Sequence, residues 1–393
     1  MPAMLGDEAS ELLGAAVAQA NASVLSVRPV QVTWHPGRSL HVTYDALVAW
    51  NRNRRTAERF VAATGDGLPE AAVRLARDDE QVAVWPMSGD PALPGLAIAM
   101  DPLRVSELLG SLGGSDGPVS ILVRAYRPGR RAVVEVSGDG SRVYLKVVPP
   151  ASVAGLQERH RMLADSLPVP RSHGWSSEFG LVVLEALPGE TLRSALKVRR
   201  RPLPAASDLV ALLNRIPPVS DGRSSTPPLA SATQHALLIG SLLPELACRV
   251  ERLQAMLCEG EASLPTVPVH GDFHEAQVLV GGGEVVGLLD VDTVGLGHRI
   301  DDWANLIGHL SSLEAFAARE VRPRMAKFTR DALSAATEDT GCAGELRRRI
   351  AAVVLGMATG PFRAQSTTWP SDTRARVALA ERWVADPQRI ESS

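Results

Sequence analysis

Residues 267–306 read VPVHGDFHEAQVLVGGGEVVGLLDVDTVGLGHRIDDWANL and carry the strongest structural signal in the chain. Asp272 lies in a His-Gly-Asp turn after a short apolar run, and Gln277 opens the apolar segment QVLV. Three glycines, 281–283, separate it from a second apolar segment that ends at Asp290. Two such segments around a glycine turn predict a β-hairpin. This pairing would place Gln277 and Asp290 at the same end of the hairpin, with Asp272 just before it.

The chemistry of these three side chains indicates a reaction class. Magnesium prefers hard oxygen ligands and usually keeps waters and substrate phosphates in its remaining positions. The Asp290 carboxylate and the Gln277 amide oxygen would suit such an ion. The remaining carboxylate, Asp272, can accept a proton from an attacking hydroxyl group. The stretch therefore predicts a magnesium-assisted phosphoryl transfer.

The same stretch resembles the aminoglycoside phosphotransferase and choline-kinase-like family, whose motif is HGDxHxxN, then a hairpin and an aspartate. The matching residues are His270, Gly271, Asp272, His274, Asp290, Gly295, Gly297 and Asp302. The resemblance implies that Asp272 is the catalytic base, that Asp290 is the principal magnesium ligand and that ATP is the phosphoryl donor. It also implies that His270, His274 and Asp302 shape the site through packing and hydrogen bonds.

Gln277 departs from the family motif, which usually has an asparagine as second metal ligand. Glutamine offers the same amide oxygen on a side chain one methylene longer, so ligation remains possible with a slightly shifted backbone. The alternative is a degenerate site in a catalytically impaired, nucleotide-binding pseudokinase. The pattern also resembles the bacterial maltokinase and glucosamine kinase branch, whose members carry an extra N-terminal cap. The stretch 360–370, GPFRAQSTTWP, is similar to that branch as well.

The composition excludes several other classes of protein. The 393 residues carry a formal net charge of -3, whereas a nucleic-acid binder would show a basic excess. The three cysteines form no CxxC pair, which argues against a zinc site or a disulfide framework. No run of about 20 apolar residues predicts a membrane span, and acidic residues near the N-terminus do not fit a signal peptide. We expect a cytoplasmic protein, either a monomer or a homodimer.

The order of predicted elements indicates an α+β protein with the two-lobed, protein-kinase-like fold that the resemblance implies. We expect an N-terminal cap over residues 1–110, a mainly β N-lobe with one helix over 111–188, and a mainly helical C-lobe over 189–393. Within these regions the pattern predicts a helix over about 1–25, strands within 29–47 and 81–100, a three-stranded meander over 118–148 and a helix over about 152–166. Residues 34–44 resemble residues 126–136, so either the likeness is chance or the cap is built like the following sheet.

The resemblance also extends to nucleotide binding upstream of the hairpin. Lys146, in the segment VYLKVV, corresponds to the lysine that contacts the α- and β-phosphates of ATP; the alternative is a sheet-edge lysine that points to water. Glu158 is the best-placed partner for it, unless it is an ordinary solvated glutamate. Glu185 and Leu187 match the strand whose main chain binds adenine. Arg130 stands in the turn that replaces a glycine-rich loop, where it contacts phosphates or is simply solvated.

The acceptor of the phosphoryl group is the least constrained part of the prediction. Asp301, Arg363, Gln365 and Trp369 are candidates to line its pocket, because tryptophan with arginine and glutamine suits a sugar. The alternative is that these residues belong to a surface loop between two helices and do not line a pocket. We expect a kinase of carbohydrate metabolism acting on a sugar or amino sugar similar to glucosamine or maltose. An antibiotic phosphotransferase of the aminoglycoside type is the alternative.

Overall fold

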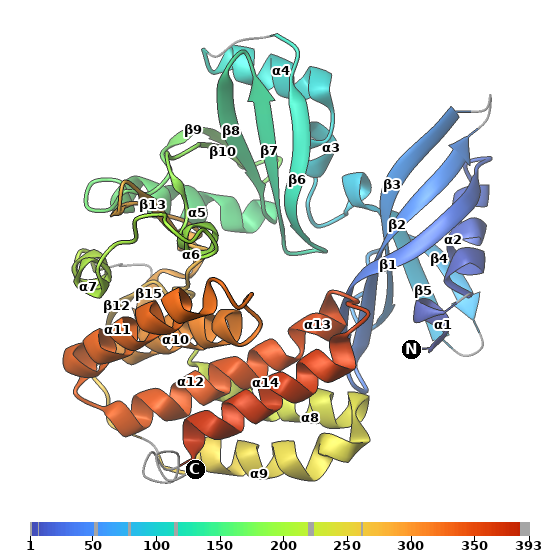
Figure 1. Ribbon diagram of the computed structural model, residues 1–393. Helices are drawn as coiled ribbons and strands as arrows, with labels where there is room; N and C mark the ends of the chain where they lie inside the picture. The colour runs from blue at the N-terminus through green and yellow to red at the C-terminus, as the bar shows by residue number, and fades with distance from the viewer. Residues whose placement is uncertain are drawn as a thin grey trace. The chain divides into compact units, whose positions relative to one another are not determined.

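The structure, a computed structural model, describes residues 2–6, 8–50, 54–77, 80–113, 117–218, 224–260 and 262–385 (Figure 1). The chain forms two compact units. Unit 1 comprises Met1–Gln157, Ser172–Ala186 and Phe362–Thr367, and unit 2 comprises Glu158–Arg171, Leu187–Pro361 and Thr368–Ser393. Antiparallel sheets dominate unit 1 and helices dominate unit 2, so the expected α+β class is confirmed.

The N-terminal part of unit 1 is an antiparallel sheet with the strand order β1-β2-β3-β5-β4. Its strands are β1 (Ser23–His35), β2 (Ser39–Trp50), β3 (Arg54–Gly65), β4 (Val73–Arg77) and β5 (Glu80–Pro86). Two helices precede them, α1 (Pro2–Leu5) and α2 (Glu8–Ala18). Helix α2 buries Leu12, Leu13 and Val17 and packs beside β1 and β4. The apolar face of this short helix thereby closes one side of the sheet.

Two expectations for this region were wrong in their extent. The predicted N-terminal helix to about residue 25 ends at Ala18, because Asn21 adopts a left-handed conformation and β1 begins at Ser23. The predicted strand segment 81–100 ends at Pro86, after which the chain forms a 3-10 turn, η2 (Met87–Gly89), and helix α3 (Leu96–Ala99). Strand β3, which the sequence pattern did not predict, buries Phe60–Ala63 between β2 and β5.

A second antiparallel sheet follows helix α4 (Pro102–Ser111) and has the order β6-β7-β8-β10-β9. Strands β6 (Ser120–Arg127), β7 (Arg131–Gly138) and β8 (Ser141–Val147) confirm the predicted meander, and β9 (Ser172–Ser176) and β10 (Leu181–Glu185) complete the sheet. Each sheet thus contains a three-stranded meander whose third strand pairs with the fifth. The shared order agrees with the interpretation that the N-terminal region is built like the sheet that follows it.

The two faces of the second sheet have different neighbours. One face, with Val134, Leu145 and Val183, joins the buried apolar cluster of unit 1 that also contains residues of α3 and α4. The other face buries Val182 in a small cluster with residues from the first half of helix α5 (Pro150–Leu163). Because side chains alternate along a strand, Lys146 of β8 shares this second face with its register partner Val182.

Unit 2 is mainly helical and carries two small sheets. Its helices are α6 (Leu192–Leu196), α7 (Ala206–Asn214), α8 (Ala232–Leu242), α9 (Ala247–Cys258), α10 (Arg299–Ala315), α11 (Arg322–Thr340), α12 (Ala343–Ala358) and α14 (Trp369–Val384). The short helix α13 (Gly360–Arg363) begins in unit 2 and ends in unit 1. One sheet has the order β11-β13-β14, with β11 (Glu190–Thr191), β13 (Val278–Gly281) and β14 (Glu284–Leu288). The other pairs β12 (Val267–Val269) with β15 (Gly295–Gly297).

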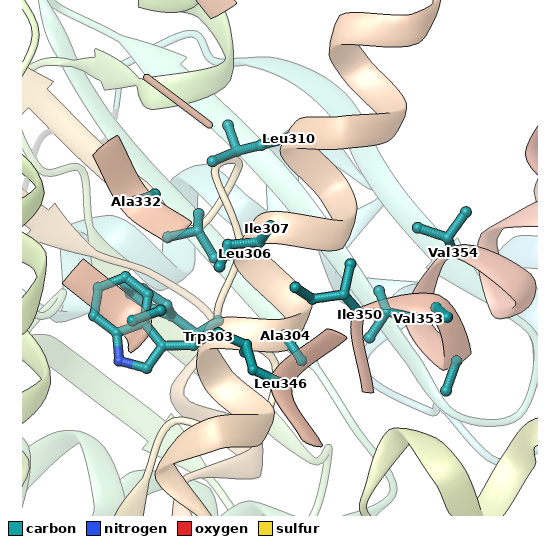
Figure 2. Packing of buried hydrophobic residues seen from close by; sticks show 14 of the residues in the cluster. Trp303, Ala304, Leu306, Ile307, Leu310, Ala332, Leu346, Ile350, Val353 and Val354 are labelled. Carbon is teal, nitrogen blue, oxygen red and sulfur yellow. The ribbon is translucent and has the colours of Figure 1, made fainter. Parts of the chain in front are cut away.

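Helix α10 forms the centre of the unit 2 core, as its apolar spacing predicts. Trp303, Leu306, Ile307 and Leu310 are almost completely buried, while Leu313 packs at the edge. Figure 2 shows these side chains among residues of α11 and α12: Ala332, Leu346, Ile350, Val353 and Val354. This buried helix supports the groups at its N-terminal end. Among the described residues, no helix combines the length and apolarity needed to cross a membrane.

Candidate functional site

The predicted hairpin forms, and its register brings the first pair of candidate residues together. Val278 of β13 pairs with Leu288 of β14, and the Leu289 amide donates to the Gln277 carbonyl oxygen at 2.8 Å. This hydrogen bond extends the antiparallel pairing by one residue beyond the two strands. As a result, Gln277 Nε2 lies 3.4 Å from Asp290 Oδ2.

The two carboxylates of the candidate site differ in backbone and exposure. Asp290 has a φ of 55°, in the left-handed region that non-glycine residues rarely adopt and that occurs often at functional sites. The Asp272 side chain is 42% exposed, so it is open to a substrate. A carboxylate beside an amide group that can turn its oxygen toward it offers a donor set that suits a hard divalent cation. Asp290 and Gln277 therefore fit a magnesium site.

Asp302 holds the turn that carries Asp272. Its Oδ2 accepts from the His270 amide at 2.7 Å and its Oδ1 accepts from the Gly271 amide at 2.8 Å. The side chain is completely buried in the first turn of α10. The core helix thus fixes the turn that carries Asp272 through two charge-assisted hydrogen bonds.

Burial gives Asp302 an unusual ionisation. Complete burial raises the pKa of its carboxyl group to about 7, although the His270 and Gly271 amides favour the charged form. We expect kcat to fall as the pH drops below about 7, because protonation removes the negative charge of Asp302 and weakens the hydrogen bonds that it accepts from the two amides of the turn. Folding stability responds in the opposite direction. A carboxyl whose folded pKa exceeds its unfolded pKa stabilises the fold most below about pH 4, and this contribution is lost as the pH rises through about 7.

The Asp302→Asn variant is the control for this pH dependence. Its neutral amide resembles the protonated acid, since only one of its two side-chain atoms can accept a hydrogen bond. The variant should have low kcat at every pH, and the pH-dependent component of its free energy of unfolding should disappear. The measurements are pH profiles of kcat and of urea unfolding. An unchanged acid limb of kcat in the variant would assign that limb to another group.

The turn that carries Asp272 requires a glycine at position 271 and is held by the hydrogen bonds of His270. Gly271 has a φ of +81°, and a Cβ there would lie 2.6 Å from the Thr293 carbonyl oxygen. His270 is fully buried; its Nδ1 accepts from the Asp272 amide at 3.3 Å, and its Nε2 donates to the Leu289 carbonyl oxygen at 2.9 Å. His270 therefore ties the turn that carries Asp272 to the residue before Asp290.

Three residues of the site were missed by the sequence interpretation. Glu275 is 1% exposed and pairs with Arg193 of α6, whose Nη2 lies 2.7 Å from Glu275 Oε1. The Arg193 amide also donates to the Glu275 carbonyl oxygen at 2.9 Å. His309 of α10 places Nδ1 3.4 Å from Glu275 Oε2. Burial opposes ionisation of Glu275, but His309 and Arg193 outweigh it and lower its pKa to about 2. No local pattern could reveal a partner 82 residues away.

Loss of the Arg193 guanidinium should leave a buried carboxylate that keeps its two histidine neighbours, His274 and His309. We expect Arg193→Ala to lower the free energy of unfolding by about 1–3 kcal/mol, less than for a fully buried pair because Arg193 is 40% exposed. The exposed neighbouring pair of Arg201 and Glu190 provides a matched control, and Arg201→Ala should cost under about 1 kcal/mol. Urea unfolding measures both. Equal costs would show that the Arg193–Glu275 pair is no stronger than a surface pair.

His274, Glu275 and His309 form a compact group with the residue types of a metal site, but their geometry argues against one. The two histidine rings stack with centroids 4.3 Å apart and planes 12° apart, so their in-plane lone pairs cannot meet at one ion. His274 Nδ1 already accepts from the Ala276 amide at 3.2 Å. Burial, followed by the charge of His309, lowers the pKa of His274 to about 3, so this ring is neutral at physiological pH.

Of the residues predicted to bind nucleotide, Lys146, Glu185 and Arg130 belong to unit 1. The chain passes into unit 2 between Ala186 and Leu187, so Leu187 belongs to unit 2. Lys146 is 4% exposed. Glu185, the last residue of β10, and Leu187, which follows the strand, are both half-buried. Arg130 is exposed in the turn between β6 and β7. Lys146 is buried among apolar strand neighbours, including its register partner Val182 on β10. A buried ammonium group needs a partner of opposite charge, and a bound phosphate would supply one.

Glu158 has a different partner from the one expected. Its carboxylate forms a bidentate pair with Arg161 one turn later on α5, at 2.6 and 2.8 Å, and both side chains are exposed. The geometry is that of an ordinary surface pair at (i, i+3) spacing. Glu158 lies in unit 2 and Lys146 in unit 1.

The predicted acceptor residues lie on different elements of the chain. Asp301 is buried and forms an ion pair with Arg349, which also pairs with Glu345 at 2.7 Å. Arg363 and Gln365 belong to the segment Phe362–Thr367 of unit 1, and Gln365 Nε2 donates to the Phe362 carbonyl oxygen at 2.6 Å. Trp369 begins α14 in unit 2 and packs against its core.

Residues 123–336 of the chain match the model of a known protein family, which is described as the phosphotransferase enzyme family. Curated protein sequences give no match. The matched segment extends from β6 to α11, covers more than half of the chain and contains Lys146, Asp272, Gln277, Asp290 and Asp302.

Solved structures similar to this chain include three phosphotransferases or kinases. One is a thermostable mutant of aminoglycoside phosphotransferase APH(4)-Ia in ternary complex with ADP and hygromycin B (TM-score 0.48, 14% identity, 71% of this chain and 98% of that chain). A second is apoenzyme macrolide 2'-phosphotransferase MphH from Brachybacterium faecium (0.43, 19%, 71% and 98%). The third is a choline/ethanolamine kinase family protein from Mesorhizobium loti (0.47, 13%, 75% and 95%).

Proposed function

Because this chain belongs to the phosphotransferase enzyme family, we propose that it transfers the γ-phosphoryl group of ATP to a hydroxyl group of a small molecule. The observation that supports this most is the meeting of Gln277 and Asp290 beside the turn that carries Asp272. In phosphoryl transfer the protein mainly positions reactants and stabilises charge. A turn fixed by the buried Asp302 meets that requirement.

The roles of the residues follow from their position and chemistry. Asp272, which is open to solvent, orients the acceptor hydroxyl and takes its proton. Asp290 and Gln277 are the residues that would hold magnesium. When bound, magnesium neutralises charge on the phosphate oxygens. Lys146 would contact the α- and β-phosphates, and the main chain at Glu185 and Leu187 would bind adenine. Arg130 is exposed in a turn where it could contact phosphates.

We infer that the acceptor is a sugar or amino sugar similar to glucosamine or maltose. Two features support this: Gln277 stands in place of the usual asparagine, and an additional five-stranded sheet precedes the sheet that carries Lys146. A cationic aminoglycoside would favour a strongly acidic pocket, and the C-terminal half of the chain shows no obvious acidic run. Asp301, Arg363, Gln365 and Trp369 remain proposed acceptor residues.

The test is magnesium-dependent release of ADP from ATP in the presence of glucosamine, glucose, maltose and several aminoglycosides. Strong stimulation by one sugar would establish the proposed reaction and its substrate class together. Stimulation by an aminoglycoside alone would replace the sugar assignment with the antibiotic one. If ATP binds but no acceptor stimulates release, Gln277→Asn distinguishes a disabled metal site from an untested acceptor.

A further inference from the structure

The amide group of Gln277 has two neighbours that make opposite demands on it. Its Nε2 atom lies 3.4 Å from Asp290 Oδ2 and 3.3 Å from His274 Nε2. A side-chain amide has a donor NH₂ group and an acceptor oxygen, which exchange places when the amide flips by 180°. The Asp290 carboxylate is an acceptor only and prefers the NH₂ group. The preference of His274 depends on which of its ring nitrogens carries hydrogen.

The surroundings of His274 fix that tautomer. Its Nδ1 accepts a hydrogen bond from the Ala276 amide at 3.2 Å, so Nδ1 carries a lone pair and the ring proton must reside on Nε2. The side chain is 12% exposed and stacks on His309 with ring centroids 4.3 Å apart, which holds its orientation. His274 Nε2–H is therefore a donor that points at the Gln277 amide and prefers its oxygen.

The two orientations correspond to different states of the metal site. With NH₂ toward Asp290, the amide donates to the carboxylate and occupies the position that a cation would need. With Oε1 toward Asp290, two oxygens face each other and form a cation-binding pair. The oxygen has two lone pairs, so it can accept from His274 Nε2–H and still offer a pair to a cation. His274 stabilises only the second orientation.

We propose that His274 is a positioning residue that turns the Gln277 amide so that its Oε1, and not its NH₂ group, faces Asp290. The inference rests on the proposed function and deepens it, since it assigns a role to one more residue of the same site. Partners of metal ligands commonly act in this way, by holding a ligand in the orientation that binding requires. The extra methylene of glutamine adds a rotatable bond relative to asparagine, so an orienting group matters more here.

The test is the affinity for Mn²⁺ in the presence of ADP, measured by electron paramagnetic resonance as the loss of the free Mn²⁺ signal. His274→Phe keeps an aromatic ring for the stack with His309 but removes the N–H donor. We expect it to weaken Mn²⁺ binding about tenfold, the lower end of the usual effect of such partners. His173→Phe, at an exposed position on β9, is the control and should bind as the wild type does.

The decisive comparison repeats His274→Phe in a Gln277→Glu background. A carboxylate presents oxygen in both of its orientations, so no orienting group is needed, and His274→Phe should change Mn²⁺ affinity less than about twofold there. An equal loss in both backgrounds, or no loss in either, would overturn the orienting role while leaving the proposed function intact. Failure of wild-type protein with ADP to bind Mn²⁺ would instead overturn the proposed metal site itself.

A second measurement does not depend on the folding of any variant. The ¹⁵N chemical shifts of a neutral histidine ring distinguish the two tautomers. In the wild-type protein, His274 should show a protonated Nε2 and an unprotonated Nδ1. The opposite tautomer would reverse the preference for the Gln277 oxygen and refute the inference.

Discussion

Replacement of Asp272 by alanine is expected to reduce kcat by about 10²–10⁴-fold, the range associated with loss of a general base. Binding of ATP should change little, because Asp272 lies in the turn before the hairpin and no nucleotide contact is assigned to it. The physical reason is that the acceptor hydroxyl loses the carboxylate that orients it and takes its proton. The measurements are kcat with the preferred acceptor and the dissociation constant of ADP. They separate chemistry from binding.

The control for this prediction is Asp331→Ala on the surface of α11, where the carboxylate pairs with exposed Lys327. This variant should retain the kcat of the wild type. Full activity of Asp272→Ala would remove Asp272 from the mechanism. A loss of activity together with a comparable loss of ADP binding would show that the turn supports the nucleotide and would contradict a role confined to the acceptor.

Replacement of Asp290 by asparagine is expected to lower kcat by about 10²–10³-fold at a fixed magnesium concentration, because the charged ligand of the cation is lost. Asparagine is the appropriate substitute, since it tolerates the left-handed backbone that Asp290 adopts. Alanine would add strain at this φ and confuse a local effect with a structural one. The same variant should also bind Mn²⁺ more weakly when ADP is present.

The response to magnesium distinguishes the two variants. Part of the activity of Asp290→Asn should return as the magnesium concentration is raised, because weaker binding is compensated by mass action. Activity of Asp272→Ala should not return, because the missing group is a base and not a metal ligand. Asp292→Asn, two residues further along, tests whether the effect is specific to position 290. If Asp292→Asn is as impaired as Asp290→Asn, the assignment of the metal ligand is wrong.

Local spacing was sufficient to predict the hairpin and the pair of residues at its base. An apolar strand, a glycine turn and a second apolar strand allow few registers, because a shift by one residue would turn the buried side chains outward. The meander of the second sheet was predicted for the same reason. The N-terminal helix and the segment after Pro86 were misjudged in extent, since periodicity does not mark where an element ends.

The sequence also left the predicted acceptor residues without a common location. Asp301 proved to be the buried partner of Arg349, and Arg363 and Gln365 belong to a different unit from Trp369. Arg363, Gln365 and Trp369 are close in sequence, whereas Asp301 lies far before them, and whether the four side chains share a pocket depends on how helices pack. Neither spacing nor composition contains that information, so the choice of acceptor stays a proposal that the activity panel tests.

The sequence alone was enough to predict a chemistry for this protein, because the proposed reacting groups Asp272, Gln277 and Asp290 come from one continuous stretch whose turns fix their spacing. Tertiary structure was needed for everything that holds those groups in place. Arg193 reaches Glu275 across 82 residues, and His309 stacks on His274 from the core helix α10. Such contacts depend on the packing of distant segments and leave no local pattern. One physical consequence, the burial and the His309 neighbour that lower the pKa of His274 to about 3, arises only in the folded chain.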